Sequence, residues 1–293
     1  MIDLHTHSTA SDGSYSPREL IREASRRGLN AIALTDHDTI DGLQEGSDEA
    51  EKLGIHFVPG IEVEIEQETG KNGWSPGGEF HLLGLGIKKP APSFLDMVKD
   101  LQKFREERNR EILDRMEEQG IEAKPEDIAA FSKGSSLGRP HFAAFLIKRR
   151  LVKNIEQAFS RYLGPGQVLY VPRKGVAFER AAAAIRESGG IPVIAHPLSL
   201  YLAWGKLPAF IARLKERGLS GLEAWHPAAK TGECKRLEKL GKTLDLYITE
   251  GSDYHGEARK GRQLGLSAGG KKIEDSVLEA IPELRAGLFS AAK

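Results

Sequence analysis

The first third of the chain alternates short apolar runs with amphipathic segments. Residues 31–35 are a continuous apolar run of the kind that forms a buried parallel strand, and residues 57–65 predict a further strand. Before them, Ser16 is followed by Pro17 and Glu19, which supply the N-cap, first-turn proline and capping-box acid of a helix start. This alternation predicts strand–helix units arranged around a parallel sheet or barrel.

The middle of the chain carries a different pattern. Residues 94–119 are rich in helix-forming Arg, Glu and Lys, and no strand pattern interrupts the chain before the Gly-Pro-Gly at residues 164–166. Three further strands then alternate with helices, at residues 192–195, 222–225 and 246–249. We therefore expect seven strands in one α/β domain, formed by residues 1–88 and 166–293, with a helical insertion at residues 89–165.

The composition is that of an ordinary globular chain. The 293 residues are 40% hydrophobic, and 42 basic residues balance 42 acidic ones, so no overall field attracts nucleic acid or lipid. Neither a signal peptide nor a run of about 18 uninterrupted apolar residues is evident, so we expect a cytoplasmic protein without a membrane span. Cys234 is the only cysteine, which excludes a disulfide scaffold and any multi-cysteine metal site.

Histidine, aspartate and glutamate gather where the predicted strands end. His5 and His7 follow the first strand at a spacing of two, which points both imidazoles to one face. Alone, such a pair also fits ordinary polar or core histidines. Nine such side chains lie at or near the C-terminal ends of six predicted strands: His5, His7, Asp12, His37, Glu62, His81, His196, Asp253 and His255. Parallel α/β barrels build their active sites at this edge, so we expect a metal centre there.

The segments that contain these residues resemble those of the polymerase and histidinol phosphatase (PHP) superfamily of metal-dependent phosphoesterases. The resemblance spans the chain apart from the insertion and rests on His5-Thr6-His7, Ser11-Asp12-Gly13, Thr35-Asp36-His37-Asp38, Pro59-Gly60-Ile61-Glu62, Phe80-His81-Leu82-Leu83-Gly84, Ala195-His196-Pro197 and Gly251-Ser252-Asp253-Tyr254-His255. It implies a distorted seven-stranded (β/α)7 barrel of PHP type. The helical insertion looks similar to that of the TrpH-like nucleotide phosphatases.

The resemblance also implies a trinuclear metal site. It assigns the ligands to three ions, with Glu62 as a bridge, in the groups His5, His7, Glu62 and Asp253; Glu62, His81 and His196; and Asp12, His37 and His255. Mixed imidazole and carboxylate ligation suits Mn, Fe or Zn, and we expect two or three divalent ions, with Mn favoured. Three such ions exceed the charge of three carboxylates and one hydroxide by about +2, which a phosphate monoester dianion would balance. The expected chemistry is attack on phosphorus by a metal-activated hydroxide, without a side-chain nucleophile.

Candidate substrate contacts lie mostly in and after the insertion. Pro140 follows Arg139 at a predicted helix start, where N–H groups beside a cation can take an anion, although an ordinary capped turn fits as well. The resemblance favours the anion site, because TrpH-type proteins hold a second phosphate with this segment. The candidates are Ser135, Ser136, Arg139, His141, Arg173, Lys174 and His226, of which the last three also fit plain surface or loop positions. The charged run at residues 105–115 mixes signs and predicts a solvated helix face.

These features predict a phosphatase, a metal-dependent phosphoric monoester hydrolase that acts on a small phosphorylated, nucleotide-like substrate. Removal of the 3'-phosphate from a nucleoside 3',5'-bisphosphate is the best single choice, and the alternatives are a 5'-3' exonuclease on short RNA ends and a histidinol-phosphate-type phosphatase. An amidohydrolase barrel also begins with His-x-His, but it typically bridges its metals with a carboxylated Lys where this chain offers Glu62. A non-enzymatic metal-binding module predicts missing ligands, and none is missing. No duplex DNA partner is expected, because the chain has no basic tract with interleaved aromatic residues.

Overall fold

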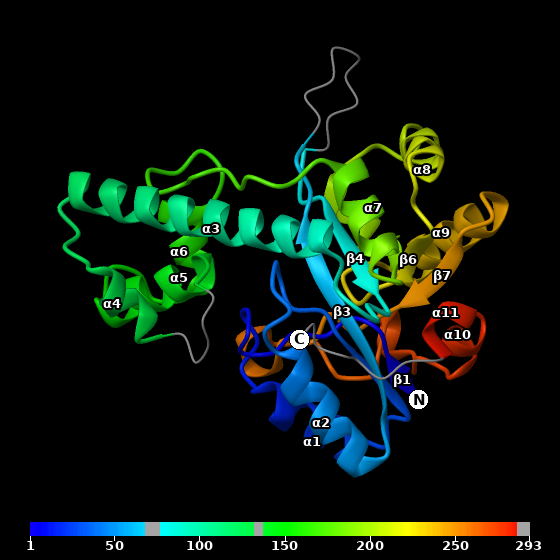
Figure 1. Ribbon diagram of the computed structural model, residues 1–293. Coiled ribbons are helices and arrows are strands. Elements are labelled where there is room, and N and C mark those ends of the chain that lie inside the picture. Colours follow the sequence, from blue (N-terminus) through cyan, green and yellow to red (C-terminus); the bar gives the residue numbers. More distant parts are fainter. Residues whose placement is uncertain (68–76, 132–136, 286–293) are drawn as a thin grey trace.

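The computed structural model describes residues 1–67, 77–131 and 137–285. Seven strands form one sheet in chain order, so that each strand pairs with the next one along the chain (Figure 1). The strands are β1 (Ile2–Asp3), β2 (Ala31–Leu34), β3 (His56–Glu64), β4 (His81–Leu85), β5 (Ile191–Ile194), β6 (Gly221–Trp225) and β7 (Tyr247–Glu250). Most of their side chains are buried, as expected of strands covered by helices. The predicted seven-stranded α/β fold is therefore confirmed.

The sheet curls until its two edges nearly meet. Thr6, after β1, forms a parallel bridge with Tyr254, after β7. The Asp3 carboxylate strengthens this closure, because it accepts hydrogen bonds from the backbone N–H groups of Ser252 at 3.0 Å and Gly265 at 2.7 Å. Asp3 is fully buried, and burial raises the pKa of its carboxyl group to about 6. One buried carboxyl group thus fastens the first strand to the chain that follows the last.

One strand departs from the parallel arrangement that the sequence pattern predicts. β4 is antiparallel to both β3 and β5, whereas all the other neighbouring pairs are parallel. A parallel connection needs a crossover, usually a helix, and the described residues between β3 and β4 contain no helix. The reversal places His81, the first residue of β4, opposite Glu64 at the end of β3. The N-terminal end of β4 therefore lies at the edge where its neighbours have their C-terminal ends.

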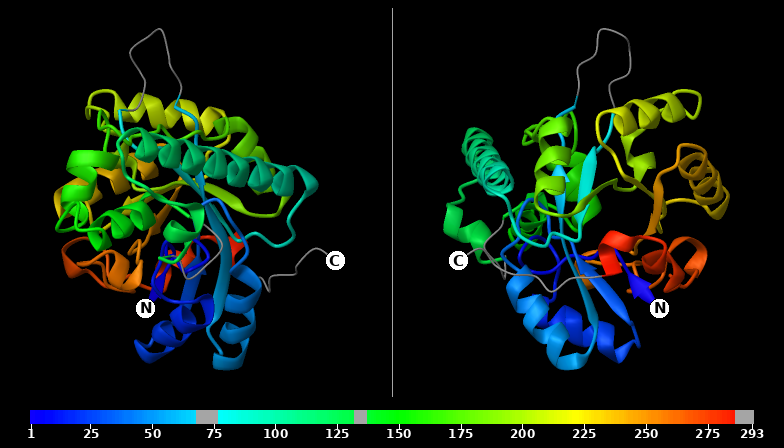
Figure 2. Two further views of the ribbon diagram at one scale, coloured as in Figure 1. Left: turned by 90° about the vertical axis from the view of Figure 1, so that its left-hand side faces the viewer. Right: turned by 45° about the vertical axis from the view of Figure 1, so that its right-hand side comes forward.

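Helices cover the outside of the barrel, as strand–helix units require. They are α1 (Pro17–Arg26), α2 (Leu43–Leu53), α7 (Phe178–Glu187), α8 (Leu207–Glu216) and α9 (Thr231–Thr243), with the short α10 (Ser276–Glu279) and α11 (Pro282–Arg285) after β7. α1 and α2 lie side by side (Figures 1 and 2). The predicted capping box is present, since Ser16 Oγ accepts from the Glu19 N–H and the Glu19 carboxylate accepts from the Ser16 N–H. The sequence thus predicted this helix start correctly.

Between β4 and α7 the chain forms a helical lobe beside the barrel (Figure 1). Its elements are α3 (Pro92–Glu118), α4 (Pro125–Ala129), α5 (Arg139–Lys148), α6 (Ile155–Ala158) and a π-helical turn (Phe159–Leu163). α3 belongs to two hydrophobic cores, because Phe94 packs in the core of the barrel and Ile112 packs with Phe142 in the core of the lobe. These two cores support the division into a barrel and an insertion at residues 89–165, which we retain as a proposal.

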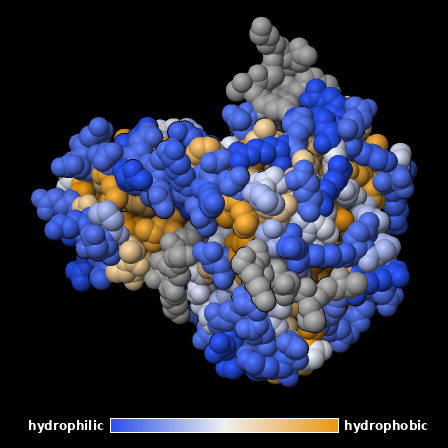
Figure 3. All heavy atoms as spheres, in the orientation of Figure 1, coloured by the Kyte–Doolittle hydropathy of each residue, from blue (hydrophilic) through white to orange (hydrophobic). Residues whose placement is uncertain are grey.

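Hydrophilic side chains cover most of the molecular face seen in Figure 3, and hydrophobic atoms show between the helices of the lobe. Within the described ranges, no helix combines the length and the apolar character needed to cross a membrane. Some large hydrophobic side chains are nevertheless exposed, namely Leu53, Leu151, Ile155, Val168 and Tyr201. Ile155 and Tyr201 share one large cavity, where an exposed apolar side chain can meet a ligand.

Candidate metal centre

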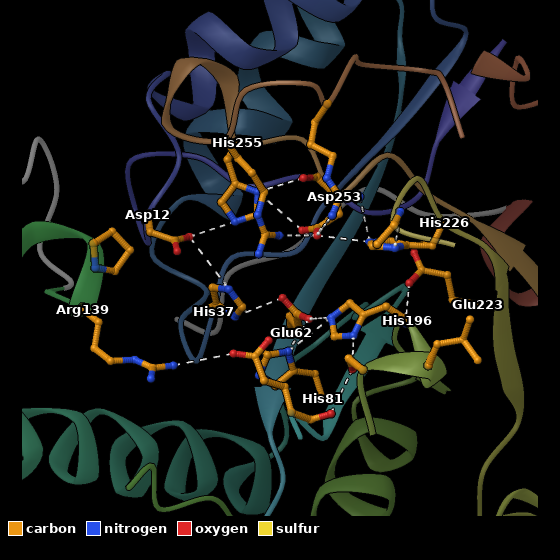
Figure 4. A pocket seen from close by; sticks show the side chains of 18 of the residues that line it. Asp12, His37, Glu62, His81, Arg139, His196, Glu223, His226, Asp253 and His255 are labelled. Atoms are coloured by element: carbon orange, nitrogen blue, oxygen red, sulfur yellow. Dashed lines mark hydrogen bonds and ion pairs between the residues drawn. The ribbon is translucent and has the colours of Figure 1, made fainter. Parts of the chain in front are cut away.

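The nine proposed metal ligands come together at one edge of the barrel. They belong to β3 and β4 and to the loops after β1, β2, β5 and β7, and are His5, His7, Asp12, His37, Glu62, His81, His196, Asp253 and His255. All except His5 and His7 line a cavity of about 670 Å³, and those two are buried. Figure 4 shows that the labelled ligands point toward one another across this cavity. The edge rule for barrels thus placed eight of the nine side chains, whereas His81 lies at the N-terminal end of β4 and reaches this edge because that strand is reversed.

The donor atoms of these residues form overlapping groups in which the atoms lie within 4.8 Å of one another. The groups are His7, Asp12, His37 and His255; His5, His7 and Asp253; His5, Glu62 and His196; and His37, Glu62 and His81. Within the part of the chain that the structure describes, several buried ligand atoms have no hydrogen-bond partner, namely His5 Nε2, His7 Nδ1, His7 Nε2, Asp12 Oδ1 and Glu62 Oε2. Buried polar atoms are normally satisfied, so the residue set fits divalent cations, which would supply the missing partners.

Glu62 lies in the middle of the cluster. Its Oε2 faces three imidazole nitrogens at 3.0 to 3.4 Å, those of His5, His7 and His37. Its Oε1 lies 2.9 Å from two further imidazole nitrogens, those of His81 and His196. Burial alone would raise the pKa of Glu62, but the charges of His37 and His81 hold it well below its usual range. An ionised carboxylate with one oxygen toward each ligand group has the geometry to bridge two cations.

The backbone is strained where ligands leave the strands. His196 and Asp253 have φ angles of 26° and 51°, in a region that residues other than glycine rarely adopt. Gly251 lies just before Asp253, and a Cβ atom at this position would be 2.3 Å from the Cβ of His5. Only glycine therefore allows the end of β7 to approach the end of β1 so closely. Strain and close approach together bring the ligands into one cluster.

Sequence analysis missed Glu223, in the middle of β6. Its Oε1 lies 2.9 Å from His5 Nδ1, and its Oε2 accepts a hydrogen bond of 2.6 Å from the backbone N–H of His196. The carboxylate and the His5 imidazole are both buried. A carboxylate on one ring nitrogen orients the other nitrogen toward a metal and raises its basicity. A lone acidic residue inside an apolar strand is the signal that would have found Glu223.

The two aspartates that flank His37 hold neighbouring segments in place. Asp36 accepts a hydrogen bond of 2.5 Å from the Ser11 hydroxyl, which fixes the loop that carries the proposed ligand Asp12. Asp38 Oδ2 accepts a hydrogen bond from Arg105 of α3 at 2.5 Å, and so ties this loop of the barrel to the helical lobe. The ligand loops therefore rest on buried polar contacts with their surroundings.

Four arginines line the side of the cavity that faces the lobe: Arg105, Arg108, Arg139 and Arg173. The guanidinium groups of Arg139 and Arg173 share Glu79, whose Oε1 lies 3.6 Å from the first and 3.4 Å from the second. Among the described residues, nitrogens of Arg105, Arg108 and Arg139 are buried without a hydrogen-bond partner. Burial and the charges of Arg173 and Arg139 lower the pKa of Arg108. This wall is therefore electropositive and suited to an anion.

The prediction that residues 105–115 form a solvated face is wrong for two of these arginines. The side chain of Arg105 is 20% exposed, and Arg108 is 7% exposed. The mixed signs of the run did not show which charged positions are buried, because a long helix turns some of them toward the solvent and others toward the barrel. The sequence thus predicted two of the four arginines of this wall, Arg139 and Arg173.

The other predicted substrate contacts have different positions. Ser135 and Ser136 lie outside the described residues. His141 Nδ1 accepts a hydrogen bond of 2.9 Å from a backbone N–H at the start of α5, and His141 does not line the cavity. Lys174 is exposed and pairs with a glutamate of α3 at 3.5 Å, outside the cavity. His226 does line the cavity and lies 3.1 Å from a carboxylate oxygen of a proposed ligand.

Two further arginines, which sequence analysis did not single out, line the cavity near His226. They are Arg259 and Arg262, from the segment that follows β7, and both approach the carboxylate of Asp253. The residues after His255 carry no periodic pattern and no motif that the sequence analysis used, so nothing in the sequence marked the two positions. The cavity therefore has positive charge on two sides of the ligand cluster.

Cations held by imidazoles and carboxylates, with arginines on the surrounding walls, meet the requirements for hydrolysing a phosphate ester. The reacting phosphoryl group is negative, and its hydrolysis needs an activated water rather than a side-chain nucleophile. The fold and the cavity thus define the chain as a metal-dependent phosphoesterase.

Comparisons with known proteins agree with this class. The PHP domain model matches residues 3–163. A 5'-3' exoribonuclease of Haemophilus influenzae is 34% identical over 253 residues, which are 86% of this chain and 89% of that protein. A 3',5'-nucleoside bisphosphate phosphatase of Chromobacterium violaceum is 31% identical and covers 90% of each chain. A candidate metal-dependent phosphoesterase from Bifidobacterium adolescentis has a solved structure that matches with a TM-score of 0.82 and 26% identity, over 98% of this chain and 97% of that one. The chain belongs to the PHP domain family.

We predict that Glu62→Gln removes most of the metal affinity, because the amide lacks the negative charge that faces both ligand groups. Elemental analysis of wild-type protein should find two or three ions per chain, and chelation should lower its Tm. The variant should bind metal more than about a hundredfold more weakly. This loss exceeds the one expected when a residue that only contacts a metal ligand is changed. Glu66→Gln, which changes an exposed carboxylate just after β3, is the control. Wild-type metal content and turnover in Glu62→Gln would show that the bridging assignment is wrong.

Glu223→Gln should lower metal affinity by about tenfold to a hundredfold, because His5 loses the carboxylate that orients its ring. Metal titration of the purified variant, followed by the rise in Tm, measures this change. Glu216→Gln, at the exposed end of α8, should behave as wild type. If Glu223→Gln keeps the wild-type metal affinity, the carboxylate does not act on the ligand cluster.

Proposed function

We propose that the protein removes the 3'-phosphate from small nucleotides that also carry a 5'-phosphate, with a nucleoside 3',5'-bisphosphate as the best single substrate. The observation that carries this proposal is the continuity of one cavity, in which the ligand cluster faces the arginine wall. One region suits the phosphate to be cleaved, and the other suits a second phosphate. The name of the Chromobacterium violaceum relative supports the choice.

We infer that the ligand cluster holds two or three divalent ions. The mixed ligands suit Mn, Fe or Zn, of which we favour Mn, and the family resemblance favours three ions. The groups we propose are those that the family resemblance implies: His5, His7, Glu62 and Asp253; Glu62, His81 and His196; and Asp12, His37 and His255. Such ions supply an activated water nucleophile and neutralise charge on the phosphoryl oxygens. The protein's own residues fix the positions of the ligands, and we expect the enzyme to work in the cytoplasm.

The arginine wall would hold the second phosphate. Arg139 lies with its guanidinium group 5.5 Å from the centre of the Phe159 ring, which limits its freedom to move. Its Nε is buried without a hydrogen-bond partner. Arg173 is fixed from the other side by a hydrogen bond of 2.6 Å to Glu64. Two such guanidinium groups offer parallel N–H donors, the geometry that phosphate oxygens accept best.

An apolar wall completes the cavity, formed by Ile155, Phe159, Leu198 and Tyr201. Tyr201 is 78% exposed, although tyrosine usually buries its ring, and its φ of 52° is strained. An exposed aromatic ring at a nucleotide site stacks on a base, which is worth about 1–3 kcal/mol. A nucleotide therefore matches the cavity better than a small phosphate ester without a base.

A 5'-3' exonuclease on short RNA ends is the second candidate, because the Haemophilus influenzae relative carries that name. The balanced charge of the chain argues against tracking along long nucleic acids. A histidinol-phosphate-type phosphatase ranks lower, since a substrate with one phosphate would leave the arginine wall without an anion.

We predict that Arg139→Ala lowers kcat/KM for adenosine 3',5'-bisphosphate by about tenfold to a hundredfold, because a charge-assisted contact with the second phosphate is lost. An aryl phosphate, which has no second phosphate, should be hydrolysed nearly as fast as by wild type. Arg110→Ala removes an exposed arginine of α3 and is the matched control. Equal losses on both substrates would mean that Arg139 is structural or touches the reacting phosphate, and no loss on either would remove it from the site.

A further inference from the structure

The cavity extends past the ligand cluster on the side away from the arginine wall. There it is lined by residues that follow β6 and β7, namely His226, Ala228, Ala229, Ala258, Arg259 and Arg262. In Figure 4, Asp253 and His226 lie on one side of Glu62, and Arg139 lies on the other. Of the two groups of arginines in the cavity, the proposed function uses only the arginine wall. Arg259 and Arg262, the second cationic region, have no role in it.

Arg259 and Arg262 converge on the outer oxygen of Asp253. Arg259 Nη1 lies 2.5 Å and Arg262 Nη2 lies 3.6 Å from Asp253 Oδ2. The other oxygen of this carboxylate, Oδ1, faces the ligand cluster, 3.4 Å from His7 Nε2. Arg262 Nη1 also lies 3.2 Å from His226 Nε2, which fixes its guanidinium group at the cavity wall. The pair therefore lies directly beside the place where the reacting phosphate would bind.

One carboxylate oxygen does not satisfy two guanidinium groups. Each group has five N–H donors, and the Asp253 carboxylate also serves the ligand cluster. In the part of the chain that the structure describes, Arg259 hydrogen-bonds through Nη1 alone. Its side chain is 48% exposed, so the remaining donors are open to an anion that enters the cavity. This is a second place where the cavity can take a phosphate.

We propose that Arg259 and Arg262 form a subsite for the next phosphate downstream of the cleaved bond in a short single-stranded oligonucleotide, an inference that rests on the proposed function. In a nucleoside 3',5'-bisphosphate, water oxygen bonds to phosphorus, the P–O3' bond breaks, and a water proton passes to O3'. In a 5'-phosphorylated oligonucleotide the same phosphorus also carries O5' of the next nucleotide. The same bond breaks, and the next nucleotide keeps the phosphate as its 5'-phosphate.

The two regions then take different parts of the substrate. The first nucleotide lies toward the lobe, where its 5'-phosphate meets Arg139 and Arg173. The rest of the oligonucleotide has to leave the ligand cluster in another direction, and the region of Arg259 and Arg262 lies there. A mononucleotide does not reach this region, because it has no phosphate beyond the one that is cleaved.

The test compares three substrates that break at the same bond: adenosine 3',5'-bisphosphate, 5'-phosphorylated diadenylate and 5'-phosphorylated triadenylate. Only the triadenylate has an internucleotide phosphate beyond the cleaved one. Initial rates of the first cleavage should show that Arg259→Ala and Arg262→Ala lower kcat/KM for triadenylate about tenfold to a hundredfold more than for the other two. Lys260→Ala removes an exposed charge from the same segment, outside the cavity, and should leave all three rates unchanged.

Equal losses on the three substrates would overturn the subsite, because the arginines would then act on Asp253 or on the cleaved phosphate. Wild-type rates in both variants would overturn it as well. A wild-type protein that hydrolyses the bisphosphate but neither oligonucleotide would remove the subsite and leave the proposed function intact. A wild-type protein that hydrolyses none of the three would remove the proposed function itself.

Discussion

Buried ionisable side chains need compensating charge close by. The cluster around Glu62 is the part of this molecule where that need is greatest. One carboxylate is shared by five imidazoles, those of His5, His7, His37, His81 and His196. Leaving such groups unpaired in a protein interior costs several kcal/mol each. Divalent cations meet the requirement only if all the strands deliver their ligands to one edge. The reversal of β4 brings His81 to this edge, and the backbone is strained at Asp253, beside the same cluster.

Closure of the barrel and support of the ligands depend on the same buried carboxylates. Asp3 fastens β1 to the chain after β7 and also accepts a hydrogen bond of 3.2 Å from the backbone N–H of His5. Glu223 of β6 contacts the His5 ring after β1 and the His196 backbone after β5, so that one carboxylate connects three strands. A ligand fixed in this way stays in position without the metal, which lowers the cost of binding it. Stability of the fold and affinity for metal are therefore two results of one network.

The sequence pointed to the proposed ligands but not to the residues that support them, and the reason is geometrical. Parallel strands end at one edge, so residues such as His37 and His196 could be assigned to the cluster from their places after apolar runs. Strand direction is not encoded in that pattern, and His81 came to the right edge only because β4 is reversed. Glu223 lies within a strand rather than at its end, so the rule that ligands follow strand ends did not identify it. Arg108 and Arg259 were missed because neither a helix face nor an irregular segment can be oriented without the fold.

Chemistry and recognition come from different parts of this chain. The proposed metal ligands lie on the barrel, whereas the arginines of the two cationic regions lie on the helical lobe, at Arg173 after it, and on the segment after β7. The link to the proposed metal centre differs between the two regions, because Arg139 pairs with Glu79, which is not a proposed ligand, whereas Arg259 pairs with the proposed ligand Asp253. Hydrolysis at P–O3' is the same reaction whether the phosphorus carries a free oxygen or another nucleotide. Under the proposed function, the regions that bind phosphate decide the length of the substrate, and the proposed metal centre decides which bond breaks.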